Sequence, residues 1–226
     1  MKIDLQLFGG RGGSSGSGPG LPSGNGGGGG GGAAYDTQEM VTMRGEKTQE
    51  VDDVLTVARS FRDTFGANVV PEELQVTRND IGATMAFYDA GGNLALNKAY
   101  FDTQKMNTAY DRTVQSGFHP DRGGKPAIEA VAAHEMGHRL ADVATQRIAS
   151  ASSFSTDKIE KQIVRNAAKE IKARGALGVA NQISRYAKTN YSECIAEAVA
   201  DVYCNGNQAS RASQAVYAEL RKALGR

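Results

Sequence analysis

The segment from Ala127 to Ile148, AIEAVAAHEMGHRLADVATQRI, limits how this chain can fold more than any other part of the sequence. It contains no helix breaker except Gly137, and Pro126 stands just before it, where a proline suits the first turn of a helix. We therefore expect one long helix. The VAA and MG residues around its polar positions are uncharged, which is typical of a buried helix. Those polar positions are His134, Glu135 and His138.

These three residues have the spacing of a metal site. On an α-helix, residues four apart lie about 6 Å apart along the axis, so the imidazoles of His134 and His138 can converge on one ion. Glu135 is rotated by about 100° from His134, which places its carboxylate beside a water at the metal rather than on the metal. Because two of the chain's three histidines lie here, we favour a zinc site over ordinary polar residues on a core helix.

A catalytic zinc ion usually has three protein ligands and a further position for water. The segment YSECIAEAVADVY offers Glu193, Glu197 and Asp201, each four residues from the next, on one face of an otherwise apolar helix. Acids on an apolar face are costly unless a positive charge lies among them. Zinc and its histidines would supply that charge. The spacing alone does not distinguish Glu193 from Glu197 as the third ligand.

The motif HEMGH followed by ECIAEAVAD resembles the gluzincin metallopeptidases, whose third ligand is a glutamate on a downstream helix. The stretch RYAKTNYSECIAEAV is similar to the zinc-site region of the anthrax lethal factor type. This resemblance implies that Glu193 is the ligand, that Glu197 holds an imidazole in position and that Tyr186 stabilises the oxyanion. A thermolysin-style alignment would make Glu197 the ligand and Asp201 its support. We favour Glu193 because the match at Tyr186 accompanies it. The matching positions are Tyr186, Thr189, Asn190, Glu193, Ala196 and Glu197.

A second resemblance concerns the setting of the protein. The stretch FHPDRGGKPAIEAVAAHEMGHRL resembles zincin-like domains of phage minor head and morphogenesis proteins, in which His-Pro precedes the ligand helix. We expect His119 of that His-Pro to stabilise a turn rather than to bind metal. The first residues, MKIDLQLFGGRGG, are similar to the starts of structural and head-module proteins of phages and prophages of Gram-positive bacteria. Phage head or capsid proteins are therefore expected partners, through the N-terminal segment.

Together these features predict a zinc metalloendopeptidase that acts on a protein or peptide substrate, with Glu135 as general base. Two alternatives remain. One is a phage head-module protein with an assembly role, whose zincin domain is auxiliary or inactive. The other is an effector protease that acts on host proteins.

The expected fold class is α+β of zincin type, mostly helical with a small antiparallel sheet. Apolar periodicity predicts helices over 50–65, 156–173, 191–204 and 208–224, beside the ligand helix. The stretch AFYDAGGNLALN predicts one hairpin over 86–97. We expect its NLALN strand to form an edge along the active-site cleft, where an extended peptide could bind by main-chain hydrogen bonds.

Three parts are expected along the 226 residues: a short motif over 1–8, a Gly/Ser-rich disordered linker over 9–34 and a metallopeptidase domain over 35–226. The formal net charge of +1 gives no reason to expect nucleic acid or a membrane as partner. The basic segment 158–174 carries interleaved acids and an apolar stripe, which indicates a solvated helix face.

The sequence also gives an expectation about the cellular compartment of the protein. The opening residues, MKIDLQLF, are too short and too polar for a signal peptide, so we expect a protein of the bacterial cytoplasm or of the virion. Cys194 and Cys204 lie ten apart in one predicted helix, about 15 Å along its axis, and cannot form a disulfide there. Free thiols fit a reducing compartment.

Overall fold

The structure is a computed structural model. The predicted N-terminal motif over 1–8 and the linker over 9–34 lie outside its described residues, as does the predicted turn at 90–92. The described residues are 39–42, 48–70, 75–79, 84–88, 94–150 and 154–226.

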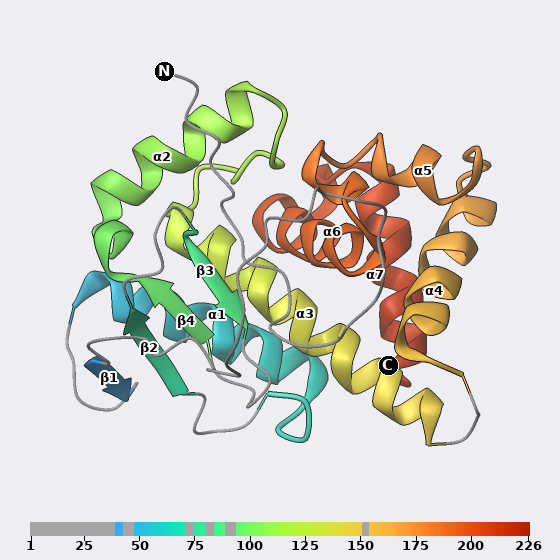
Figure 1. Ribbon diagram of the computed structural model, residues 1–226, viewed down its shortest axis with the longest axis horizontal. Helices are drawn as coiled ribbons and strands as arrows, with labels where there is room; N and C mark the ends of the chain where they lie inside the picture. The colour runs from blue at the N-terminus through green and yellow to red at the C-terminus, as the bar shows by residue number, and fades with distance from the viewer. Residues whose placement is uncertain (1–38, 43–47, 71–74, 80–83, 89–93, 151–153) are drawn as a thin grey trace, which may run out of the picture.

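The described chain is mostly helical with a small sheet, and α3 (Ala127–Ala149) runs through its middle (Figure 1). The sheet lies on one side of α3 and the helices that follow α3 in the chain lie on the other, which makes α3 the element shared by both halves. On the sheet side are α1 (Gln49–Phe65) and α2 (Thr103–Gln115); on the other are α4 (Thr156–Glu170), α5 (Gly175–Ala180), α6 (Tyr191–Asn205) and α7 (Arg211–Ala223).

The sheet is mixed rather than antiparallel throughout. Its strands are β1 (Glu39–Thr42), β2 (Gln75–Asn79), β3 (Ala86–Tyr88) and β4 (Leu94–Asn97), in the order β1-β2-β4-β3. The predicted pairing of β3 with β4 is confirmed as antiparallel. However, β4 also pairs in parallel with β2 and so lies inside the sheet. The prediction that β4 forms the edge along the cleft is therefore wrong, and among the described strands β3 is the edge strand that lies next to α3.

The predicted long helices are present with boundaries close to those expected. Two helices, α2 and α5, were not predicted. In α2 the apolar signal is weak, because only Met106, Tyr110 and Thr113 of its thirteen residues are buried. In α4 the apolar stripe is buried and most of its basic residues are exposed, as expected for a solvated helix face. Both cysteines lie on α6 as free thiols. None of the helices in the described ranges has the length and apolar character needed to cross a membrane.

The helices α3 and α6 approach each other closely at Gly137. A Cβ atom added to Gly137 would lie 2.7 Å from Cα of Ala196 and 3.1 Å from Cβ of Val199. Because no other residue lacks Cβ, only glycine fits at this position without displacing the α6 backbone. The close contact sets the distance between the helix that carries His134 and His138 and the helix that carries Glu193.

We expect Gly137→Ala to lower the free energy of unfolding by about 1–3 kcal/mol, the usual cost of forcing an extra carbon into a packed core. Chemical denaturation of the two proteins measures this. Gly178→Ala is the control, because a Cβ at Gly178 meets its nearest neighbour at 3.4 Å, an ordinary contact distance. Equal stability of wild type and Gly137→Ala would show that the two helices separate without cost.

Candidate metal centre

Two adjacent elements bring three donor groups together. His134 and His138 lie one turn apart on α3, and Glu193 lies in the first turn of α6. Oε2 of Glu193 is 3.1 Å from Nε2 of His134 and 3.3 Å from Nε2 of His138. All three side chains are buried, and one donor atom from each lies within 4.8 Å of the other two. This group could hold a metal ion.

The start of α6 explains the position of Glu193. The side chain of Asn190 caps the helix by accepting a hydrogen bond of 2.8 Å from the backbone N–H of Glu193. An N-cap of this kind fixes the first turn, because it satisfies one of the backbone N–H groups that have no partner within the helix. The carboxylate of Glu193 is thereby held against the two histidines of α3.

The other ring nitrogen of each histidine contacts a group outside the trio. Nδ1 of His134 donates to Oε1 of Glu197 at 2.9 Å, and Nδ1 of His138 lies 2.9 Å from Oγ of Ser192. With its Nδ1 proton engaged by a carboxylate, neutral His134 presents a lone pair from Nε2, as a metal ligand must. Donor atoms of the three residues thus converge on one point, and the set fits a cation.

The electrostatics of the cluster also favour a positive charge. Burial lowers the pKa of His134, but hydrogen bonds to Glu193 and Glu197 outweigh burial and raise that pKa to about 10. Burial likewise opposes ionisation of Glu193, yet the imidazoles of His138 and His134 hold its pKa well below the usual range. Two buried carboxylates and two imidazoles therefore stabilise one another only when a cation or protons lie among them.

Glu197 contacts the Nδ1 side of the His134 ring, whereas Glu193 faces its Nε2 side. Its Oε1 accepts hydrogen bonds from Nδ1 of His134 and from Nδ1 of His119, both at 2.9 Å. Its Oε2 accepts a hydrogen bond of 2.7 Å from the hydroxyl of Ser184. The geometry thus brings Glu193, and not Glu197, into the group that could hold metal. His119 is outside that group, and its Nδ1 contacts the carboxylate that also contacts His134.

Asp201 is not part of the cluster. Its Oδ1 accepts a hydrogen bond from Asn205 at 2.8 Å, and its Oδ2 accepts one from the backbone N–H of Ser210 at 3.0 Å. These contacts tie the end of α6 to the start of α7. Among the described residues, the contacts of Asp201 thus give no support to the alternative in which it supports a ligand, because both of its carboxylate oxygens bond to Asn205 and Ser210.

Glu135 lies beside the trio and is fully buried. Burial raises the pKa of Glu135 from 4.5 to about 7; the imidazoles of His134 and His138 oppose this, Glu193 adds to it and the nearby backbone of Tyr88 opposes it. A carboxyl group with a pKa near 7 can both accept and release a proton at neutral pH. Tyr88 belongs to β3, so this edge strand lies next to the cluster.

We expect Glu135→Gln to stabilise the metal-free protein above pH 7. Because the native pKa of Glu135 is raised to about 7 from 4.5, the native state retains a proton that the unfolded state has released at intermediate pH. Wild-type stability therefore falls, as pH rises between these two values, by up to about 1.4 kcal/mol per pH unit. Glutamine removes this loss. Urea denaturation from pH 5 to 8 measures both proteins, and identical pH dependence would refute the raised pKa.

Tyr186 lies at the edge of the cluster, in the short 3₁₀ helix Tyr186–Lys188. Its ring is 6.0 Å from that of His134, centroid to centroid. Burial raises the pKa of Tyr186 well above its usual range, and the carboxylates of Glu193, Glu135 and Glu197 act in the same direction, as does a hydrogen bond to Glu193. The phenol therefore keeps its proton and can donate it in a hydrogen bond within the cluster.

Comparisons with protein-family models, with curated proteins and with solved structures found no match to this chain. The cluster therefore has to be interpreted from its own geometry. The sequence pointed to five of the residues around Glu193, namely His134, Glu135, His138, Tyr186 and Glu197, but gave no site role to His119, Ser184 or Ser192. For His119 a signal was present, since it is the third of only three histidines. For the two serines the sequence carried no signal.

Proposed function

We propose that this chain is a zinc metalloendopeptidase with a zincin-like fold, in which His134, His138 and Glu193 bind the metal. The observation that carries the proposal is the convergence of three buried donor atoms within 4.8 Å, from residues with the HExxH…E arrangement. Two nitrogen ligands and one oxygen ligand are a set that zinc accepts, with a fourth position for water. Hard cations such as calcium and magnesium prefer oxygen ligands alone.

When bound, zinc would polarise the scissile carbonyl and lower the pKa of a water molecule toward about 7. The chain's own residues supply the other steps. Glu135, with a pKa raised to about 7, takes the proton of the attacking water and passes it to the leaving amine. Tyr186 donates a hydrogen bond to the oxygen that gains negative charge.

The position of β3 supports a peptide as substrate. As the edge strand beside α3, it is the element along which an extended peptide could add a further strand by main-chain hydrogen bonds. Such a peptide would pass close to Glu135, because the backbone of Tyr88 in β3 contacts that carboxyl group. A phage or prophage setting is part of this proposal and rests on the resemblance of the first residues and of 118–140.

Elemental analysis of protein purified without chelators, together with cleavage of a peptide library, tests the proposed function. We expect one zinc ion per chain and cleavage at discrete sites by the wild-type protein. The Glu135→Gln variant is the matched control for a contaminating protease, since it should bind zinc and cleave the library far more slowly than wild type. Protein without stoichiometric metal, or with equal cleavage by both forms, would overturn the proposal.

We expect Tyr186→Phe to lower kcat by about 100- to 1000-fold, the usual effect of removing one donor to an oxyanion. Zinc content and KM should change little, because the hydroxyl acts mainly in the transition state. Steady-state kinetics on a library-selected peptide measures this. Tyr191→Phe, at a tyrosine outside the cluster, is the control. Normal turnover by Tyr186→Phe would remove Tyr186 from the reaction.

A further inference from the structure

We infer that His119 is a positioning residue that acts through Glu197 on both His134 and Tyr186. The inference rests on the proposed function, because it concerns the same metal site. It assigns a role to the one histidine that neither the metal-binding trio nor the proposed reaction uses.

The contacts of Glu197 carry the first step. One carboxylate oxygen, Oε1, accepts hydrogen bonds of 2.9 Å from Nδ1 of His119 and from Nδ1 of His134. A carboxylate free to rotate would exchange its two oxygens between partners. Here Ser184 occupies Oε2 at 2.7 Å, so the two imidazoles share Oε1 in one fixed orientation. His119 thereby holds the acceptor that orients the His134 ring toward the metal.

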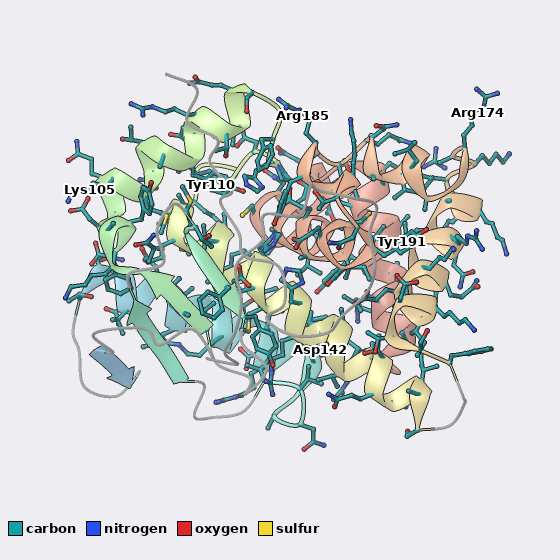
Figure 2. All side chains as sticks on the ribbon, in the orientation of Figure 1. Lys105, Tyr110, Asp142, Arg174, Arg185 and Tyr191 are labelled. Carbon is teal, nitrogen blue, oxygen red and sulfur yellow. The ribbon has the colours of Figure 1, made fainter. Side chains whose placement is uncertain are left out.

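The surroundings of His119 fix its own ring. Tyr110 stacks on it, with centroids 5.6 Å apart and an angle of 16° between the planes. Phe118 and Tyr186 meet the ring edge-on, at 4.8 Å and 5.3 Å. In Figure 2, Tyr110 lies on the side of α2 that faces the interior, and its ring is buried. Three aromatic rings therefore define the direction in which Nδ1 of His119 points.

The same segment also positions Tyr186. The backbone N–H of Tyr186 donates to the carbonyl of Phe118 at 3.1 Å, and that of Arg185 donates to the carbonyl of Gly117 at 2.9 Å. Ser184, which bonds to Glu197, also accepts the backbone N–H of Ala187 at 2.9 Å. The residues on both sides of Tyr186 are thus tied to His119 through its chain neighbour and through Glu197.

Two substitutions separate the hydrogen bond from the packing. The amide nitrogen of asparagine is as many bonds from Cα as Nδ1 of histidine, so His119→Asn can still donate to Glu197. The amide nitrogen of glutamine lies one bond further, at the place of Nε2. Glutamine fills more of the aromatic pocket than asparagine does. If His119 acts by packing, His119→Gln should retain more of the zinc affinity. If it acts through its hydrogen bond to Glu197, His119→Asn should retain more.

The experiment measures zinc affinity by competition with a chromophoric chelator, in the full chain, for wild type and both variants. We expect His119→Gln to weaken zinc binding by about 10- to 100-fold, the usual effect of losing a group that supports a ligand. His119→Asn should recover most of this affinity, and kcat should follow the same order with KM little changed. Melting of the metal-free proteins shows whether each variant is folded.

Three results would overturn the inference. The first is zinc affinity equal to wild type in both variants. The second is better binding by His119→Gln than by His119→Asn, and the third is equal weakening in both. In each case wild-type zinc binding still stands, so only the inference fails. Wild-type protein that binds no zinc would remove the proposed function and the inference with it.

Discussion

The Glu193→Ala variant should fold and should no longer hold a stoichiometric zinc ion. Glu193 presents the single oxygen that faces both Nε2 atoms, 3.1 Å from His134 and 3.3 Å from His138. Without it only two protein ligands remain, and two imidazoles on one helix do not make a closed site. Elemental analysis after gel filtration, with circular dichroism to check folding, measures the outcome.

Glu197→Ala is the matched comparison, because it removes a carboxylate one turn further along the same helix. Since Glu197 contacts Nδ1 of His134, on the other side of the ring, its loss should weaken zinc affinity by about 10- to 100-fold and leave an occupied site. If Glu197→Ala strips the metal while Glu193→Ala retains it, the two residues have been given each other's roles, as in the thermolysin-style alignment.

Turnover should fall by about 100- to 10,000-fold in Glu135→Gln, the range expected when a general base is lost. Zinc content should stay at the wild-type level, because the carboxyl group of Glu135 is not among the three donors that converge. Glutamine keeps the size of the side chain but cannot accept the proton of water. Peptide hydrolysis measured alongside elemental analysis separates the two properties.

His134→Ala is the control for this second prediction, since it removes a ligand from the neighbouring position on α3 and should lose metal and turnover together. Loss of zinc from Glu135→Gln to the same extent would mean that Glu135 is a ligand. Undiminished hydrolysis by a zinc-replete Glu135→Gln protein would mean that another group accepts the proton.

The parts of the site that could be predicted from the sequence are those fixed by helix geometry. His134 and His138 share a face because they are four apart, and Glu193 follows a helix start that Asn190 caps. The sheet order was beyond prediction, because the pairing of β2 with β4 depends on residues far apart in the chain, and β2 has no apolar alternation. Asp201 looked like a site residue because it follows Glu197 by four residues on the same helix. Its partners in the structure, Asn205 and Ser210, lie at and beyond the end of α6, and the sequence pattern does not show that turn.

Because α3 and α6 are in close contact at Gly137, a metal ion bound between them would also affect the stability of the folded chain. The donors of the proposed site lie on both helices, so one bound ion would act as a cross-link between α3 and α6. A ligand that binds only the native state, at a free concentration a thousand times its Kd, lowers the unfolded population by about 1000-fold, or about 4 kcal/mol. The lifetime of this chain in the presence of proteases would then depend on the supply of zinc.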